Sequence, residues 1–495
     1  ADRDWSSDVC SSDLIVHEVF EPLYANGFFF EQSVDQCFCN QCQCFRPDRY
    51  VEGKCPLCGF DDARGDQCDG CGKLLNAVEL IEPRCKMCGS GTVVQASKHL
   101  FLDLSKLQPE VETFVDEASK EGFWSSNSVG ITKAWLQEGL KPRCMTRDLK
   151  WGTSVPVAGY ENKVFYVWFD APIGYISITA NYDPEGWRQW WQAPRDTQGR
   201  KVELVQFMGK DNVPFHTVMF PATLLGTRQP WTMLHHISTT EYLNYEGGKF
   251  SKSRCTGVFG NDARDSNIPA SLWRYYLLAT RPETTDAAFS WSDFVGKANG
   301  ELLANLGNFV NRTARFVVAK LGGIVPAARL LPADEAFIAD KIDSELAKYA
   351  EDMEGVHLRS GLRAMMAVSA AGNLYLTEQR LDNKLLVADP ERCGTVLAVA
   401  LNIVYTLSAL IEPFMPAISR DICTILCAPS LNVLPRKFSL LLTAGQRISM
   451  QPFHLFEKVD EALVEQLRIK FAGKDGTGNA GSVNITEAAA GKKKK

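Results

Sequence analysis

The sequence predicts an α/β domain that carries a cysteine-rich insertion and is followed by an all-helical domain. Three observations predict this fold class. Short β-rich runs alternate with helical patterns over residues 99–290, which is typical of a parallel α/β sheet. Ten of the 16 cysteines lie between Cys37 and Cys88. From about Asp293 onward, apolar residues recur with the 3.6-residue period of amphipathic helices.

The composition is that of a globular protein with several domains. The chain has 495 residues, which suggests about three domains at ~150 residues each. Apolar residues make up 45% and charged residues 23%, which excludes fibrous and wholly disordered proteins. Lys and Arg number 53 against 59 Asp and Glu, a net charge of −6. RNA binding would therefore need a local basic face.

The first 31 residues divide into two parts. Residues 1–14 are rich in Ser and Asp, show no period and look like a translated cloning adaptor, so we predict that they are a non-native leader. From Ile15, apolar residues at helical spacing predict a helix that ends near Gly27. Pro22 is expected to kink this helix.

The cysteine-rich segment, residues 32–98, has the spacing of metal-ligating thiolates. Two nested sets of C-x-x-C pairs are present, an inner set of Cys55, Cys58, Cys68 and Cys71 and an outer set of Cys39, Cys42, Cys85 and Cys88. Four thiolates complete the tetrahedral shell that Zn²⁺ prefers and leave no open position for chemistry. We expect one or two structural zinc sites in a reducing compartment. Free buried thiols are the alternative, chiefly for the outer set, and iron is the alternative metal.

The first of three motifs in the α/β region is the aromatic run Trp168–Tyr175. It lies at the end of a strand expected at Val164–Phe169. A change from strand to turn there would place Ala171, Pro172 and Tyr175 at the carboxyl edge of the sheet, where ligands bind. Core packing is the alternative for such a run.

The second motif is the turn Gly209–Asp211, which follows a strand expected at Glu203–Met208. A carboxylate such as that of Asp211 on a tight turn after a parallel strand suits the hydroxyls of a ribose. His216 follows closely, and a buried histidine without a chemical role is the alternative there. A further strand is expected at Leu234–Ser238.

The third motif is the loop Lys249–Ser253, which two glycines precede. Lys249 and Lys252 flank a serine on this loop and would form a mobile cationic flap. Such a flap can neutralise charge that develops on transferring phosphates. A solvated surface turn is the alternative.

The second half of the chain carries a series of helical patterns. Four apolar-periodic segments are expected to be helices, Leu302–Val318, Phe337–Met353, Leu358–Leu376 and Thr395–Ile411. Gly394–Ile411 is uncharged and long enough to cross a membrane, but Asn402 and Thr406 on one face favour a buried helix of a bundle. A last helix is expected at about Phe456–Phe471, before a Lys-rich tail that is expected to be disordered.

In this order and spacing the motifs resemble those of methionyl-tRNA synthetases of the cytoplasmic eukaryotic and archaeal type, which are class I aminoacyl-tRNA synthetases. The resemblance runs from about Ile15 to Pro435 and includes RYVEGKCPLCGFDDARGDQC, Arg147-Asp148 before Trp151-Gly152, WFDAPIGY, GKDNVPFH, STTEYLNYEGGKFSKS and NLGNFVNR. It implies a partial class I Rossmann-type nucleotide-binding catalytic domain with a zinc-knuckle insertion, followed by an α-helical anticodon-binding bundle.

The resemblance also implies a domain order along the chain. After the leader come a remnant of the first half of the catalytic domain (15–31), the zinc-knuckle insertion (32–98), the second half of the catalytic domain (99–240), the signature-loop region (241–292), the helical anticodon-binding domain (293–472) and the tail (473–495).

The function implied is that of a cytoplasmic methionine–tRNA ligase. Such enzymes form methionyl-adenylate from methionine and ATP, with Mg²⁺, and transfer methionine to tRNA(Met). By resemblance, Lys252 stabilises the transition state that releases pyrophosphate, Lys249 supports it, and Gly209 and Asp211 join Lys252 in binding ATP. The methionine pocket is matched by Trp168, Ala171, Pro172, Tyr175, Asn212, Phe215 and His216. Neither a membrane nor DNA is an expected partner; other synthetases or tRNA-binding cofactors stay open.

The sequence also departs from the family pattern. None of its seven histidines lies in an H-x-G-H motif, so we expect an N-terminally truncated chain that forms methionyl-adenylate poorly or not at all. Asn305 matches an anticodon-contact position, but Phe309 stands where some relatives have arginine, and no tryptophan follows Trp291. Cys255 stands where a glycine is expected.

Two alternatives to a methionyl enzyme follow from these features. A class I synthetase for leucine, isoleucine, valine or cysteine would share the signature loop but lack the WFDAPIGY pocket together with the nested cysteines. A non-catalytic, synthetase-derived RNA-binding or scaffold protein is the second alternative.

Overall fold

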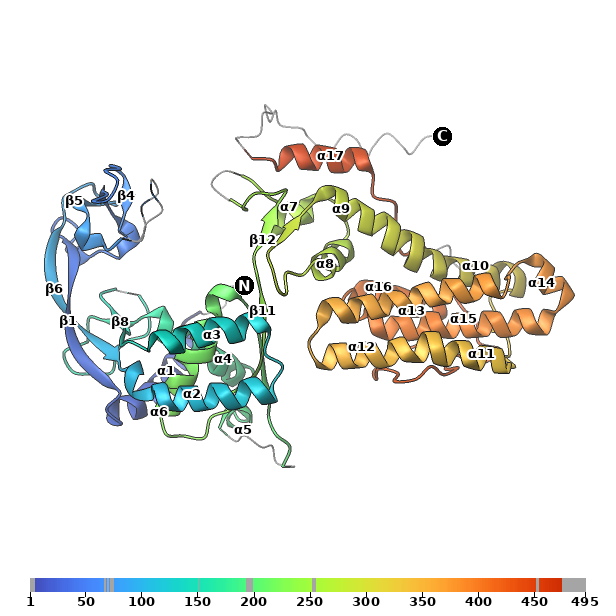
Figure 1. Ribbon diagram of the computed structural model, residues 1–495, viewed down its shortest axis with the longest axis horizontal. Helices are drawn as coiled ribbons and strands as arrows, with labels where there is room; N and C mark the ends of the chain where they lie inside the picture. Colours follow the sequence, from blue (N-terminus) through green and yellow to red (C-terminus); the bar gives the residue numbers. More distant parts are fainter. Residues whose placement is uncertain are drawn as a thin grey trace. The chain divides into compact units, whose positions relative to one another are not determined.

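The computed structural model describes residues 5–65, 68, 71, 75–149, 151–192, 199–251, 255–450 and 454–473. Lys252 of the signature loop and the tail beyond residue 473 lie outside these residues. The chain forms two compact units, Ala1–Thr239 and Thr240–Lys495. Each unit is described by itself, and Figure 1 labels the elements.

The first unit combines short sheets with a layer of helices. Its helices are α1 (Trp5–Ala25), α2 (Leu104–Glu121), α3 (Ser126–Glu138), α4 (Val167–Tyr182), α5 (Trp187–Trp191) and α6 (Phe220–Gly226). Its strands are β1 (Phe29–Cys39), β2 (Cys44–Phe45), β3 (Val51–Lys54), β4 (Ala63–Arg64), β5 (Ile81–Cys85), β6 (Val93–Leu102), β7 (Arg143–Cys144), β8 (Thr146–Arg147), β9 (Val164–Phe165), β10 (Leu204–Gly209) and β11 (Leu234–Thr240). The core lies where α1 packs against α4 and α2 against α6.

A long antiparallel ribbon carries the cysteine-rich segment. β1 pairs with β6 from Phe29 opposite Leu102 to Phe38 opposite Val93. β2 and β7 extend this ribbon into a sheet of order β2-β1-β6-β7, and β4-β3-β5 form a small sheet of their own. In Figure 1 the small sheet lies at the far end of the ribbon from the helices of the first unit.

The first unit differs from the sequence prediction at two helices. α1 begins at Trp5 rather than Ile15, although its end at Ala25 and the positive φ of Gly27 (76°) agree with the predicted stop. The predicted strand Val164–Phe169 is wrong beyond Phe165, because Val167 begins α4. A helix forms here because the apolar residues of this run, among them Phe169, Ile173 and Ile176, lie at helical spacing and bury one face. The strands predicted near β10 and β11 are confirmed to within two residues.

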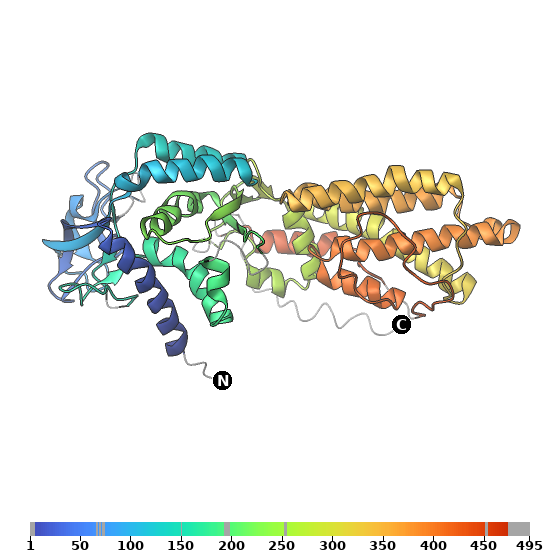
Figure 2. The ribbon, with the colours of Figure 1, turned by 90° about the horizontal axis from the view of Figure 1, so that it is seen from below.

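The second unit is a helical bundle beside one small sheet. Its helices are α7 (Gly260–Asp265), α8 (Ala270–Ala279), α9 (Trp291–Gly296), α10 (Asn308–Leu321), α11 (Pro332–Phe337), α12 (Ser344–Glu354), α13 (Leu358–Glu378), α14 (Asn383–Ala388), α15 (Pro390–Ile411), α16 (Pro416–Leu426) and α17 (Glu461–Lys470). The π-helical segments η5 (Lys297–Gly307) and η6 (Ile338–Asp343) lead into α10 and α12, and β12 (Leu243–Tyr245) pairs in parallel with β13 (Ala287–Phe289). Helices α10, α12, α13, α15 and α16 lie side by side (Figure 2).

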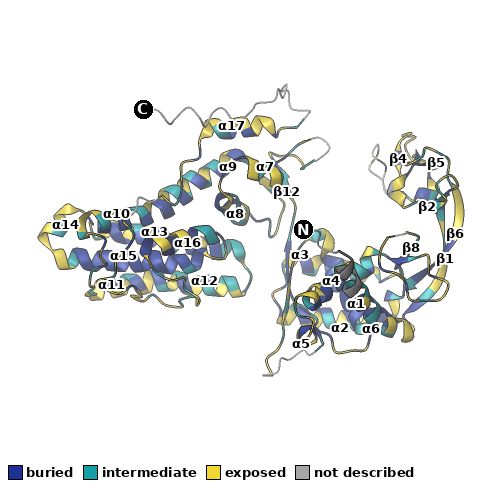
Figure 3. Cartoon of the chain, turned by 180° about the vertical axis from the view of Figure 1, so that it is seen from behind, coloured by how far each residue is buried: buried dark blue, intermediate teal, exposed yellow. Residues whose placement is uncertain are grey.

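The predicted helices of this unit are confirmed as helical segments, but those predicted at Leu302–Val318 and Phe337–Met353 each include a π-helical part, η5 and η6, and the last predicted helix is shorter than expected. The long apolar helix α15 is the one described helix with the length and hydropathy of a membrane span, and 94% of its apolar window is buried inside the unit (Figure 3). Asn402 is satisfied there, since its side-chain oxygen accepts hydrogen bonds from the backbone of Leu441 and Leu442. The helix predicted at Phe456–Phe471 begins only at Glu461, after the N-cap Asp460.

Candidate functional site

A cavity of about 350 Å³ in the first unit brings together the predicted methionine-binding residues. It lies between α4 and the turn that follows β10. Its lining consists of Val167, Trp168, Ala171, Pro172, Tyr175, Asn212, Phe215 and His216. All seven residues predicted from the sequence are in this set. Ala171, Pro172 and Tyr175 were expected at a sheet edge, and they reach the cavity instead from one face of helix α4.

Val167 is the lining residue that the sequence analysis missed. It lies four residues before Ala171 and eight before Tyr175 on α4, so the three share a helical face. The expected strand concealed this relation, because strand residues alternate between faces. A helical assignment of the run would have included Val167 in the pocket.

His216 forms the polar end of the cavity together with Tyr175. Its Nδ1 lies 2.8 Å from the backbone oxygen of Asn212, and its Nε2 lies 2.8 Å from the Tyr175 hydroxyl. Burial lowers the pKa of His216 and outweighs the hydrogen bond to Asn212, which favours the charged ring. The neutral ring therefore carries its proton on Nδ1, and Nε2 accepts the hydroxyl proton of Tyr175.

Two aromatic rings form the apolar wall of the cavity. The rings of Trp168 and Phe215 meet edge to face with centroids 5.0 Å apart. Phe215 opens a π-helical segment, Phe215–Met219, whose widened turn is frequent at functional sites. The aromatic wall and the polar pair face a cavity whose described lining residues include no Asp, Glu, Lys or Arg.

The predicted ribose-binding turn is continuous with this cavity along the chain. Gly209 ends β10, and the 3₁₀ turn Lys210–Asn212 follows it at once. Asp211 is exposed on this turn, next to Asn212 of the cavity lining. The turn therefore places a carboxylate one residue from the predicted methionine pocket.

The signature loop belongs to the second unit, where aromatic packing holds its base. Ser251 and Thr256 form an antiparallel bridge across the loop. The Phe250 ring packs against those of Tyr245 and Phe259, with centroids 5.5 and 5.8 Å away. A side chain at Gly257 would lie 2.2 Å from Phe250, so a glycine is needed there. Lys249 is exposed beside this anchor.

Cys255 closes the same loop in an unusual conformation. Its φ of 55° lies in the left-handed region, which costs a residue with a β-carbon more than it costs glycine. The glycine expected from the family pattern would suit this backbone. A cysteine at position 255 therefore carries backbone strain that a glycine there would avoid.

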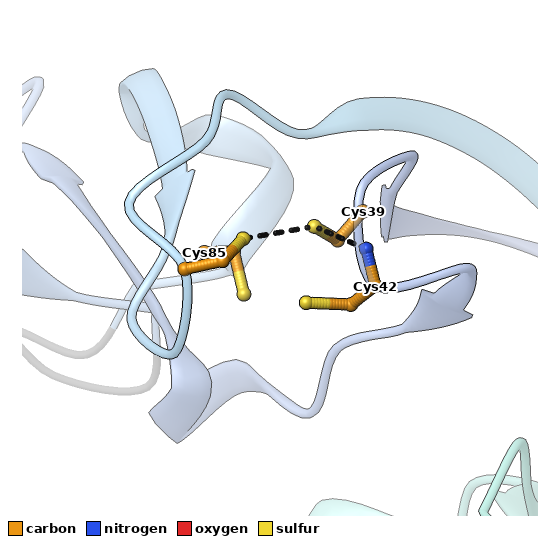
Figure 4. A group of neighbouring side chains, drawn as sticks. Cys39, Cys42 and Cys85 are labelled. Atoms are coloured by element: carbon orange, nitrogen blue, oxygen red, sulfur yellow. Dashed lines mark hydrogen bonds between the residues drawn. The ribbon is translucent and has the colours of Figure 1, made fainter.

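The eight cysteines gather into the two predicted sets. Within each set, one ligand atom from every residue lies within 4.8 Å of the others, and Figure 4 shows Cys39, Cys42 and Cys85 converging. The sulfur–sulfur distances are 3.5 Å for Cys39–Cys88, 4.0 Å for Cys55–Cys71 and 3.6 Å for Cys58–Cys68. A tetrahedral Zn–S₄ centre with bonds of ~2.3 Å needs sulfurs about 3.8 Å apart. Both clusters fit this requirement.

Asn305, the predicted anticodon-contact residue, is engaged within the bundle. Its side-chain nitrogen donates to the Met366 backbone, and its oxygen accepts from Ser369 at 3.1 Å and from Asn373 at 3.0 Å. Phe309 is fully buried, and its ring occupies the place that a β-carbon on Gly372 would need, 2.3 Å away. The contact of Asn305 with an anticodon stays a prediction.

Family comparisons cover both units. The sequence model described as "tRNA synthetases class I (M)" matches residues 8–314, and that described as "Anticodon binding domain of methionyl tRNA ligase" matches residues 325–476. The solved structure of Mycobacterium tuberculosis methionyl-tRNA synthetase in complex with methionyl-adenylate is similar, with a TM-score of 0.67 and 21% identity, covering 90% of this chain and 80% of that one. The fold is thus a class I synthetase catalytic fold followed by a helical anticodon-binding domain.

Named relatives agree with this assignment. The chain is 52% identical over 467 residues to the "Probable methionine--tRNA ligase, cytoplasmic" of Schizosaccharomyces pombe, covering 93% of this chain and 58% of that protein. It is 48% identical over 464 residues to the "Methionine--tRNA ligase, cytoplasmic" of Homo sapiens, covering 93% and 51%. The chain therefore spans between half and three-fifths of the length of these relatives. The family match over most of the chain shows that this protein belongs to the methionyl class I tRNA synthetases.

Proposed function

We propose that the protein acts as a methionine–tRNA ligase of the cytoplasm. It would activate methionine with ATP and transfer it to tRNA(Met) for protein synthesis. One observation carries the proposal: two separate segments, Trp168–Tyr175 and Asn212–His216, supply the predicted methionine-binding residues and line one cavity. The names of the relatives support the same activity. The non-catalytic alternative has no comparable support.

The cavity has the chemistry of a site for a neutral, sulfur-containing side chain. Trp168 and Phe215 offer aromatic surface, and thioether sulfur makes favourable contacts with aromatic rings. The Tyr175–His216 pair is neutral, and none of the described lining residues carries a charge that would attract an acidic or basic side chain. The pocket thus favours methionine over charged amino acids.

Activation of methionine needs positioning and charge stabilisation rather than a protein nucleophile. A carboxylate oxygen of methionine attacks the α-phosphorus of ATP, and the bond to pyrophosphate breaks. Gly209 and Asp211 would hold the nucleotide, together with Lys252 and the Mg²⁺ that accompanies ATP. Lys252 and Lys249 would stabilise charge on the departing pyrophosphate. Lys252 lies outside the described residues, so its role rests on the sequence motif.

We assign one structural zinc ion to each cysteine cluster. Cys55, Cys58, Cys68 and Cys71 would hold one ion, and Cys39, Cys42, Cys85 and Cys88 the other. Backbone N–H groups already point at these sulfurs, from Cys42 to Cys39 and from Leu57 to Cys55, each at 3.4 Å. Such donors stabilise thiolates. The ions would cross-link the cysteine-rich segment and take no part in the reaction.

The helical unit would bind the anticodon of tRNA(Met). The match of residues 325–476 to an anticodon-binding domain supports this partner. Asn305 remains the candidate contact, although α13 engages both ends of its amide. A base contact would need the side chain to exchange these partners.

Isothermal titration with methionine tests the proposal on the chain as it exists. We expect one methionine per chain and at least about tenfold weaker binding of leucine, since the pocket is shaped for the longer side chain. W168L should abolish binding. The matched control is W190L, because Trp190 is 56% exposed and lies outside the cavity lining. Equal binding of leucine, or no effect of W168L, would contradict the proposal.

A second test concerns catalysis. The proposed adenylation uses an ATP site to which the family contributes an H-x-G-H motif, and these 495 residues contain none. By themselves they are therefore expected to bind methionine but to catalyse little or no methionine-dependent ATP–pyrophosphate exchange. Robust exchange by this chain would show that the remaining residues suffice for adenylation.

A further inference from the structure

An arginine lies between two tryptophans next to the candidate methionine pocket. The guanidinium carbon of Arg143 is 5.4 Å from the ring centroid of Trp135 and 5.6 Å from that of Trp168. Both distances are within the ~6 Å range of cation–π attraction. Trp168 therefore faces a fixed cation as well as the Phe215 ring of the cavity wall.

The backbone on either side of this contact is firmly placed. Arg143 lies in β7, opposite Leu102 of β6. Trp135 lies in the last turn of α3, where the side chain of Gln108 donates to the Leu136 carbonyl at 3.1 Å and accepts from Leu140 at 2.7 Å. The cation thus joins three elements, β7, α3 and α4.

The guanidinium packs against these rings while one of its N–H groups, in the described part of the chain, stays unpaired. Its Nε is buried and has no hydrogen-bond partner among the described residues. Leaving a buried N–H unpaired is costly, so the attraction to the rings must contribute to keeping the side chain in this place. The same attraction restricts the indole of Trp168, because a ring that turns away loses the cation.

We propose that Arg143 is a positioning residue for the methionine pocket, and that it sets the orientation of Trp168 against Phe215. The inference rests on the proposed function, since it assigns the restricted ring to methionine recognition. Arg143 lies outside the cavity lining, so it acts only through Trp168. A fixed ring offers the thioether its aromatic face without first losing conformational freedom.

A double-mutant cycle with methionine titration tests this role. R143M keeps an apolar stem and removes the cation, and we expect it to weaken methionine binding about threefold to tenfold. R143K should be intermediate, because a lysine keeps the charge but loses the planar face. To keep binding measurable without the indole, the second site is W168F. In that background R143M should have a much smaller effect, since the better cation–π ring is gone.

The control and the outcomes are distinct from those of the proposed function. R264M is the matched control, since Arg264 is 74% exposed beside Asp265, and it should leave affinity unchanged. Melting temperatures within about 2 °C of the unmodified chain would exclude loss of fold. If R143M lowers the melting temperature by more than this, the methionine affinity of R143K decides whether Arg143 has the proposed role. Unchanged affinity in the Arg143 variants, or the same loss in the W168F background, would overturn the role of Arg143. Failure of the unmodified chain to bind methionine would instead refute the proposed function.

Discussion

Replacement of Asp148 by asparagine should destabilise the first unit and remove part of its acid sensitivity. Asp148 accepts hydrogen bonds from Ser97 at 2.8 Å and from Lys163, and its carboxylate lies 3.0 Å from Nε2 of His99. Burial raises the pKa of Asp148, but the hydrogen bonds from His99, Lys163 and Ser97 outweigh it and hold the pKa at about 2.

The magnitude follows from this pKa. The fall from the ordinary value of 3.8 to about 2 corresponds to about 2 kcal/mol of stability at pH 7. Since the folded value is the lower one, this stability is present above about pH 4 and is lost as the pH falls through about 2. D148N also leaves Lys163 and the buried His99 without their carboxylate, so a loss of about 2 to 5 kcal/mol is expected.

Urea unfolding followed by tryptophan fluorescence measures this effect. All of the 11 tryptophans except Trp273 and Trp291 precede Thr240, so the signal reports mainly on the first unit. The matched control is D116N, because Asp116 pairs with Lys120 on an exposed helix face and should contribute less than about 1 kcal/mol. Two results would refute the reasoning. One is a D148N chain whose first unit is as stable at pH 7 as that of the unmodified chain. The other is a D148N chain that loses as much free energy of unfolding between pH 4 and pH 2 as the unmodified chain does.

Three further predictions concern other parts of the chain. Purified protein should contain two zinc ions per chain by atomic absorption. C85S should contain one, since Cys85 belongs to the outer cluster alone. Two zinc ions per chain in C85S would contradict the assignment of zinc to the outer cluster. C255G should stabilise the second unit by about 0.5 to 1 kcal/mol in thermal unfolding, because the φ of 55° no longer strains a β-carbon; a loss of stability would show that the thiol makes a compensating contact. Y175F should weaken methionine binding about threefold to tenfold, because it leaves Nε2 of His216 without its 2.8 Å donor; unchanged affinity would mean that the pair does not shape the pocket.

Local patterns in the sequence predicted the features whose geometry is local. The C-x-x-C pairs and their nesting were sufficient to sort eight thiols into two clusters, since each turn fixes two sulfurs. The seven residues predicted for the methionine pocket came from the resemblance of two short motifs to methionyl-tRNA synthetases, and they line one cavity. Their placement was wrong for α4, since a continuous apolar and aromatic run does not distinguish a buried strand from a buried helix.

Other contacts between distant segments could not be predicted from the sequence. The packing of Arg143 against Trp168 joins positions 25 residues apart through the pairing of β7 with β6. The network around Asp148 collects Ser97 and His99 from β6 and Lys163 from the residue before β9. No periodicity or spacing marks such residues, because only the register of the strands brings them together.

The methyl resonance of ¹³C-methyl-labelled methionine, observed in the presence of the chain, tests the central claim most directly. The account predicts that the bound methyl group lies against the rings of Trp168 and Phe215. Its resonance should therefore move upfield by ring currents, and this shift should disappear in W168L. A bound methyl resonance without a ring-current shift, or a shift that persists in W168L, would contradict the assignment of this cavity to methionine.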